Sequence, residues 1–215
     1  MSKPPQPPSG RPPVPANATL TELKQAASGC SARDLYERAT QTVFGEGPPR
    51  AGVMFVGEQP GDSEDVAGKP FVGPAGKLLD QVLEEVGIDR SQVYVTNVVK
   101  HFKWIPAGKR RLHAKPNARE ISACRPWLEA EISTVKPKVL VCLGATAAQT
   151  LLGRNFRVSR QRGEFVPSSL APYVLATVHP SSLLRAPDEE TRQQERALFV
   201  EDLRKVARLL QEKSS

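Results

Sequence analysis

Residues 53–80 read VMFVGEQPGDSEDVAGKPFVGPAGKLLD and contain the junction on which the predicted fold depends. The apolar run 53–56 is typical of a short buried strand, and the GEQPG segment at 57–61 ends that strand in residues suited to a tight turn. In an open α/β sheet, ligands bind in the crevice beyond the carboxyl ends of the strands. The loop after this strand carries three polar candidates for such a site: Glu58, Gln59 and Asp62.

The second half of the stretch is a Gly/Pro-rich segment, residues 68–76, which presents one large aromatic residue, Phe71. Helical spacing of apolar residues begins at Gly76 and continues to Val86. Composition alone favours a solvated loop, but the density of glycine and proline fixes a backbone course that solubility does not require. The stretch therefore predicts a strand, a ligand-binding loop and a helix.

Strand-like and helix-like segments alternate along the rest of the chain. Strand character recurs at 92–97, 138–144, 163–166 and 173–178, and helical spacing recurs at 19–27, 32–43, 118–135, 145–152 and 187–210. This alternation predicts an α/β fold, with an open doubly wound, mostly parallel central sheet of four strands and helices on both faces. Such a sheet would bring Glu58, Asn97 and His179 to one crevice.

Two segments fall outside this alternation. Residues 1–17 are rich in proline and are predicted to be a disordered tail, followed by one α/β domain over residues 18–215. Residues 98–117 form a long basic connection that contains His101 and His113. Structureless connections of this length are usually functional or disordered, and both interpretations stay open for this segment.

Composition limits the class of protein. The chain has a formal net charge of +7 and a sequence pI of about 9.5, which suits a polyanionic partner. Its three cysteines are an odd and sparse set, which argues against a disulfide framework and for a reducing compartment. Because neither a membrane span nor a signal peptide is recognisable, we expect a cytoplasmic protein with no membrane partner.

Three motifs at predicted strand ends occur in a characteristic order: Gly57-Glu-Gln-Pro-Gly61, Thr96-Asn97 and His179-Pro-Ser-Ser182. Together they resemble the uracil-DNA glycosylase superfamily, and their spacing is similar to that of its iron–sulfur branch. The resemblance runs from about residue 30 to residue 210. The insertion Gly108-Lys-Arg-Arg-Leu-His113 looks like the loop of the UdgX-type members, which become covalently joined to uracil-containing DNA; leucine stands where that loop usually has isoleucine.

The resemblance implies a pocket for an extruded uracil base. Asn97 would pair with the O4 and N3–H edge of uracil, Phe71 would stack on the base, and Gln59 and Asp62 would help to shape the pocket. His179 would stabilise the charge that grows on uracil O2. Asn97 and His179 could instead be strand-end caps, and Phe71 could belong to the core.

The resemblance also assigns the residues that act on the sugar. Glu58 would stabilise the cation-like sugar or activate water. His113 would attack C1′ in place of water, with Glu58 as the nearest acceptor for the proton of the imidazole. Without the resemblance, a histidine in a Lys/Arg loop would be solvated or would contact phosphate.

Two basic or polar segments are predicted to contact DNA. The loop 109–111 would contact phosphates or serve as scaffolding, with Arg111 holding the loop in place. The segment after His179 would fill the gap left by the extruded base or pack under the last helix. The predicted DNA-binding residues are Lys109, Arg110, Arg111, Ser181, Ser182, Leu183 and Arg185.

A [4Fe–4S] cluster is implied by the iron–sulfur branch. Its ligands would be Cys30, His101 and Cys124, with a fourth expected at position 33, where the chain has arginine. Because arginine cannot ligate iron, the cluster would have an open site, a substitute ligand such as water or Cys142, or the site would be degenerate. The role of the cluster would be structural.

The function predicted from these residues is excision of uracil from DNA, followed by covalent attachment to sugar C1′ through His113 in a single turnover. The alternatives are a conventional multiple-turnover uracil-DNA glycosylase and a non-catalytic binder of uracil or abasic DNA. The predicted partner is uracil-containing DNA, including single-stranded DNA, and the predicted state is a monomer.

Overall fold

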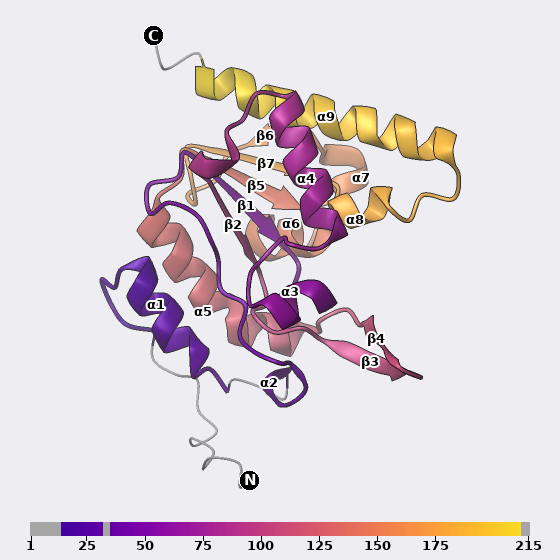
Figure 1. Cartoon of the computed structure of the whole chain (residues 1–215). Helices are drawn as coiled ribbons and strands as arrows, with labels where there is room; N and C mark the ends of the chain where they lie inside the picture. The colour runs from indigo at the N-terminus through magenta and orange to yellow at the C-terminus, as the bar shows by residue number, and fades with distance from the viewer. Residues whose placement is uncertain (1–13, 32–34, 212–215) are drawn as a thin grey trace, which may run out of the picture.

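The computed structural model describes residues 14–31 and 35–211 of the chain (Figure 1). The elements in chain order are α1 (Leu20–Ser28), α2 (Leu35–Arg38), β1 (Val53–Gly57), α3 (Asp62–Ala67), α4 (Pro74–Glu85), η1 (Arg90–Gln92), β2 (Val93–Asn97), β3 (Trp104–Ala107), β4 (Arg110–His113), α5 (Ala118–Val135), β5 (Val139–Leu143), α6 (Ala145–Leu152), α7 (Val158–Gln161), β6 (Phe165–Val166), β7 (Tyr173–Thr177), α8 (Pro180–Leu183) and α9 (Glu189–Gln211). The predicted alternation of strands and helices, and hence the α/β class, is confirmed.

The central sheet has the strand order β2-β1-β5-β7-β6. The strands β2, β1, β5 and β7 are parallel, and β6 pairs with β7 in the antiparallel direction. The prediction of four central strands was therefore one strand short. The fifth strand is only two residues long and follows a turn at Gly163 (φ +73°), whose backbone N–H donates to the carbonyl of Ala176 in β7 at 2.9 Å.

Alternate residues of β1 face opposite layers of helices, as a doubly wound sheet requires. Met54 and Val56 lie in a core cluster with residues of α5 and α6. Val53 and Phe55 lie in a second cluster with residues of α4 and α9. In Figure 1, α4 and α9 cover one side of the sheet and α5 the other. All five residues of β1 are buried, because both faces of the strand are covered.

The long basic connection is a β-hairpin, which the sequence did not predict. β3 and β4 pair in antiparallel register, with Trp104 opposite His113 and Ile105 opposite Leu112. Gly108 (φ +59°) lies in the turn between them. Trp104 Nε1 donates a hydrogen bond to the carbonyl of Arg38 at 3.0 Å, which fastens the base of the hairpin to the body. Figure 1 shows the hairpin projecting from the molecule beside α3.

Two further predicted boundaries differ from the structure. A six-residue helix, α3, occupies part of the predicted polar loop, and of the helix predicted at 32–43 the described residues form only α2. Most of the predicted tail, residues 1–13, lies outside the described residues, whereas Val14 packs against a small cluster that includes Leu23 and Trp127. Within residues 14–31 and 35–211, no helix combines the length and apolar character needed to cross a bilayer.

Candidate active site

The strand order puts the switch point of the sheet between β1 and β5. Open α/β sheets bind ligands at this point, which is called the crevice below. The chain leaves β1 toward β2 on one side and later enters β5 on the other side, so the loops after β1 and β5 diverge at this point. Glu58 follows β1 directly, and Thr146 lies in the first turn of α6, just after β5. The Thr146 hydroxyl donates a hydrogen bond to Glu58 Oε2. The predicted crevice residue Glu58 is therefore fixed by the opposite wall of the crevice.

Three predicted base-binding side chains converge on Gly57, the last residue of β1. A Cβ atom placed on Gly57 would overlap Asn97 Oδ1 and would lie 2.8 Å from Phe71 Cζ and 3.4 Å from His179 Nε2. The rings of Phe71 and His179 are stacked, with centroids 6.1 Å apart and an interplanar angle of 29°. An amide, a phenyl ring and an imidazole thus surround a point that only glycine leaves open.

The hydrogen bonds of His179 fix which nitrogen carries its proton. The backbone N–H of Ser181 donates to Nδ1 at 3.2 Å, so Nδ1 is an acceptor and the proton of the neutral ring lies on Nε2. Burial, together with the charges of Arg185 and His113, lowers the pKa of His179 to about 4. At neutral pH, His179 therefore presents an N–H donor beside Gly57, where Asn97 and Phe71 also converge. Its Nδ1 also caps α8, so the capping alternative and the base-binding role coexist.

His113 lies against Glu58 at the end of β4. Its Nε2 is 3.4 Å from Glu58 Oε1, and its side chain is half exposed. Burial lowers the pKa of His113, an effect that the nearby Glu58 carboxylate opposes and Arg185 reinforces. The imidazole is therefore mainly neutral at pH 7 and retains a nitrogen lone pair. The predicted proximity of His113 and Glu58 is present in the structure.

Arg111 fastens the hairpin to α3. Its guanidinium contacts Asp62 Oδ1 at 2.6 Å and Asp65 Oδ2 at 2.6 Å, and it lies over the rings of Phe102 and Trp104. Of the two roles predicted for Arg111, these contacts favour scaffolding. Asp62, predicted to shape the uracil pocket, directs its carboxylate to Arg111 in this structure.

Gln59 holds the two ends of the same hairpin together. Its Nε2 donates to the carbonyls of Lys103 at 3.2 Å and Ala114 at 3.0 Å, and its Oε1 accepts from the Lys103 backbone N–H at 3.2 Å. Both polar atoms of the Gln59 side chain are therefore engaged by the hairpin backbone, so Gln59 can shape the pocket by positioning the strand that carries His113.

The predicted DNA-binding residues differ in their exposure. Lys109, Arg110, Ser182 and Arg185 are exposed, and Ser181 is half-buried. The Leu183 side chain is only 1% exposed and packs in the cluster under α9, so the prediction that it contacts DNA gives way to the packing alternative. Leu184, which is 44% exposed, is the leucine that this segment presents to solvent.

The three predicted cluster ligands are all buried, but they do not form a metal site among the described residues. Trp127 Nε1 donates to Cys30 Sγ at 3.3 Å, and burial raises the pKa of the Cys124 thiol to about 11. His101 Nε2 pairs with the Thr42 hydroxyl at 2.9 Å, while its buried Nδ1 has no described partner. In the part of the chain that the structure describes, no three His, Cys, Asp or Glu side chains could hold a metal ion together.

This donor set does not fit a four-ligand cluster. Position 33, where the fourth ligand was expected, lies outside the described residues. Cys142, which was considered above as a substitute ligand, is fully buried within β5. We therefore assign no step of the chemistry to a cluster, and the [4Fe–4S] group stays a prediction.

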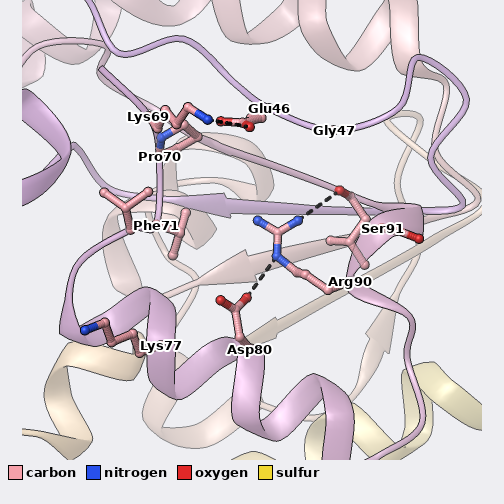
Figure 2. Close-up of a pocket in the computed structure, with 11 residues that line it drawn as sticks. Glu46, Gly47, Lys69, Pro70, Phe71, Lys77, Asp80, Arg90 and Ser91 are labelled. Carbon is pink, nitrogen blue, oxygen red and sulfur yellow. Dashed lines mark hydrogen bonds and ion pairs between the residues drawn. The ribbon is translucent and has the colours of Figure 1, made fainter. Parts of the chain in front are cut away.

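A separate groove adjoins Phe71. It has a volume of about 690 Å³ and includes Lys69, Lys77, Asp80 and Arg90 among its lining residues (Figure 2). Arg90 pairs with Asp80 at 2.9 Å, and Lys69 lies 3.6 Å from Glu46, so opposite charges offset most of its cations. None of Glu58, Asn97, His113 or His179 lines the groove, which is distinct from the crevice.

Two residues of the site were not predicted from the sequence. Thr146 orients Glu58. The sequence feature that could have pointed to this role is a hydroxyl residue at the start of the helix that follows a buried strand. Lys100 is 1% exposed and donates to the carbonyl of Asn97 at 2.7 Å while it pairs with the buried carboxylate of Glu131. Neither pairing is visible in the sequence, because each joins segments that only the fold brings together.

Residues 44–204 of the chain match the family model described as the uracil DNA glycosylase superfamily. The chain is 37% identical to a type-4 uracil-DNA glycosylase of Sulfurisphaera tokodaii over 202 residues, which cover 89% of this chain and 84% of that protein. It is also 37% identical to a type-4 uracil-DNA glycosylase of Thermotoga maritima, over 86% of this chain and 91% of that protein. A DNA polymerase of Bacillus phage SP01 is 29% identical over 86% of this chain but only 19% of its own length.

Proposed function

The chain belongs to the uracil-DNA glycosylase superfamily, and from this membership and the geometry of the crevice we propose that it excises uracil from DNA. The observation that carries the proposal is the convergence of Asn97, Phe71 and His179 on Gly57, beside the carboxylate of Glu58. An enzyme that acts on a base must extrude it from the stack and hold it by hydrogen bonds and stacking. These side chains supply both kinds of contact.

Cleavage breaks the bond between sugar C1′ and uracil N1, and the electron pair of that bond stays with uracil. Charge then develops on uracil O2, where the Nε2–H of His179 can donate a hydrogen bond. An imidazole that is neutral at pH 7 is suited to this task, because its N–H group donates without transferring the proton. Asn97 would pair with the amide edge of the base.

The sugar is left with positive character at C1′, which the Glu58 carboxylate can stabilise. In the hydrolytic route, a water molecule attacks C1′ and passes a proton to Glu58, while uracil leaves as the anion and takes up a proton. Thr146 holds one carboxylate oxygen, so the other oxygen is directed into the crevice. The products are free uracil and an abasic site.

A second route is favoured by the contact between His113 and Glu58. In this route, an imidazole nitrogen of His113 forms the new bond to C1′, the C1′–N1 bond breaks, and the imidazole proton passes to Glu58. The protein would then stay attached to the DNA and act once. Gln59 and Arg111 support this route, because they hold the hairpin so that His113 faces Glu58.

One assay separates these routes. The protein is mixed with end-labelled single-stranded DNA that contains one uracil, and half of the sample is denatured in detergent while half is heated in alkali. Strand breaks without a slower band indicate hydrolysis, whereas a uracil-dependent band that survives denaturation indicates attachment. DNA that stays intact in both halves would contradict uracil excision. DNA with thymine at the same position serves as the control.

A further inference from the structure

Glu64 is a buried carboxylate that joins the two Gly-rich loops of the site. It lies on α3 and is 8% exposed. Its Oε1 accepts the backbone N–H of Gly73 at 2.7 Å, and its Oε2 accepts the backbone N–H of Gly61 at 3.1 Å. Gly61 ends the loop that carries Glu58, and Gly73 precedes the helix that follows Phe71. One side chain therefore sets the spacing between these two loops.

Phe71 adopts a backbone conformation that its loop must enforce. Its φ is +56°, in the left-handed region that is unfavourable for a bulky residue. Gly76 permits this conformation, since a Cβ atom at Gly76 would overlap the carbonyl group of Phe71. The Gly73 N–H that Glu64 accepts lies on the short segment between these two residues. Glu64 thus holds the strained turn through the Gly73 N–H, and Gly76 leaves the space that the Phe71 carbonyl occupies.

We infer that Glu64 is a positioning residue that holds the ring of Phe71 over the base-binding point at Gly57. Removing the carboxylate would leave the buried N–H of Gly73 without its partner and would release the constraint on the Phe71 backbone. The Phe71 ring would then shift from its stacked position against His179. The two hydrogen bonds that Glu64 accepts from Gly61 and Gly73 are called the clamp below. The inference rests on the proposed function, because the clamp is inferred to hold Phe71 for stacking on the base.

The neighbouring residue provides a matched contrast. Asp65 is also a buried carboxylate on α3, but it accepts from the Thr40 backbone N–H and contacts Arg111 of the hairpin. Glu64 therefore acts on the loop of Phe71, and Asp65 acts on the hairpin of His113. Changes at these adjacent residues should affect different parts of the site.

The test is a double-mutant cycle with Phe71→Ala. Glu64→Gln keeps the shape of the side chain but has one acceptor oxygen instead of two, and we expect it to lower kcat/KM for uracil excision by about 10- to 100-fold. In the Phe71→Ala background, the same change should cost less than about threefold, because the ring that Glu64 positions is already absent. Asp65→Asn should have the same effect in both backgrounds. Equal effects of Glu64→Gln in both backgrounds would overturn the inference.

Two further measurements keep this result interpretable. Amide hydrogen exchange at Gly61 and Gly73 should be faster in Glu64→Gln than in the wild type, and unchanged exchange would show that no clamp exists. Thermal unfolding is the second measurement, and it checks that each variant is folded. A wild-type protein without excision activity would overturn the proposed function, while the exchange measurement would still decide whether the clamp exists.

Discussion

Oε1 of Glu58 lies 3.4 Å from Nε2 of His113. The loop after β1, which carries Glu58, therefore contacts the β3–β4 hairpin, which carries His113. The second oxygen of that carboxylate accepts a hydrogen bond from Thr146 on the other wall of the crevice. Glu58 is thus held between a fixed donor and an imidazole. This arrangement lets one carboxylate serve either route after uracil leaves, since it can accept a proton from water or from His113.

Removing the Thr146 hydroxyl should weaken catalysis without weakening the fold. Thr146→Val has nearly the same volume but lacks the donor to Glu58, so the carboxylate loses its fixed orientation. We expect kcat for excision to fall roughly fivefold, or about 1 kcal/mol, with KM little changed. Thr146→Ser should restore most of the rate.

The matched control for this change is Thr150→Val on the same helix. The Thr150 hydroxyl donates to the carbonyl of Thr146 within α6 and does not contact Glu58. Single-turnover rates of the variants decide the matter. A rate for Thr146→Val equal to that of Thr150→Val would show that Thr146 does not orient the carboxylate.

Replacing His113 by Ser should separate excision from attachment. The serine side chain is shorter and lacks the imidazole lone pair, so it cannot reach C1′ as His113 would, and it leaves room for water beside Glu58. We expect any covalent adduct to disappear and uracil release to continue over several turnovers. Denaturing electrophoresis with uracil-containing DNA reports both, and an adduct that persists in the variant would identify another nucleophile.

The stability of the protein should fall as the pH drops from about 6.5 to about 4. Burial lowers the pKa of His179 to about 4, whereas the pKa of histidine in the unfolded chain is near its ordinary value of 6.5. Between these values the unfolded state binds more protons than the folded state, so the free energy of unfolding decreases as the pH falls. His101, whose pKa burial also lowers to about 4, contributes with the same sign.

Urea unfolding at a series of pH values measures this slope. His179→Gln removes one of the histidines whose pKa is lowered in the folded state, so its free energy of unfolding should depend less steeply on pH in the same range. A slope as steep as that of the wild type would mean that His179 is not buried as a neutral ring.

Losing one partner of the buried pair of Lys100 and Glu131 should lower the free energy of unfolding more than expected from the loss of both partners together. Glu131 is 0% exposed and accepts from Tyr94, Thr96 and Lys100, so Lys100→Met leaves a buried charge without its counterion. We expect a loss of about 3–5 kcal/mol in the free energy of unfolding. The double change Lys100→Met with Glu131→Leu should cost less than the sum of the single changes, as chemical denaturation can show.

Iron and sulfide analysis tests the predicted cluster. If Cys30, His101 and Cys124 hold a [4Fe–4S] cluster, protein purified without oxygen should contain about four iron and four sulfide ions per chain. Cys124→Ala should then remove both. Protein that contains neither iron nor sulfide would end the prediction and leave the three side chains as core residues.

The sequence predicted the parts of the fold that depend on local pattern. The apolar run before Gly57 and the alternation of strands and helices are visible in the residues themselves, and they correctly place Asn97 and His179 at strand ends. Strand character was recognised at 163–166, but β6 was not counted in the central sheet, because its antiparallel pairing with β7 cannot be read from its residues.

The hairpin could not be predicted because its stability comes from distant residues. Pro106 interrupts the pattern of a strand, and the contacts that hold β3 and β4 come from Arg38, Gln59 and α3. For the same reason, the contacts of Gln59 and Leu183 could not be predicted from the sequence. The direction of the Gln59 side chain depends on the hairpin, and a one-residue offset in α8 decides that Leu183 is buried and Leu184 exposed.

Uracil excision can be measured by chromatography of the free base released from an oligonucleotide that contains one uracil, with the protein in excess. Both routes release uracil, so the result does not depend on whether water or His113 attacks the sugar. We expect about one uracil per strand, none from Asn97→Ala at the same time point, and no thymine from the matched control strand. Tight binding of the uracil strand without release of the base would contradict it.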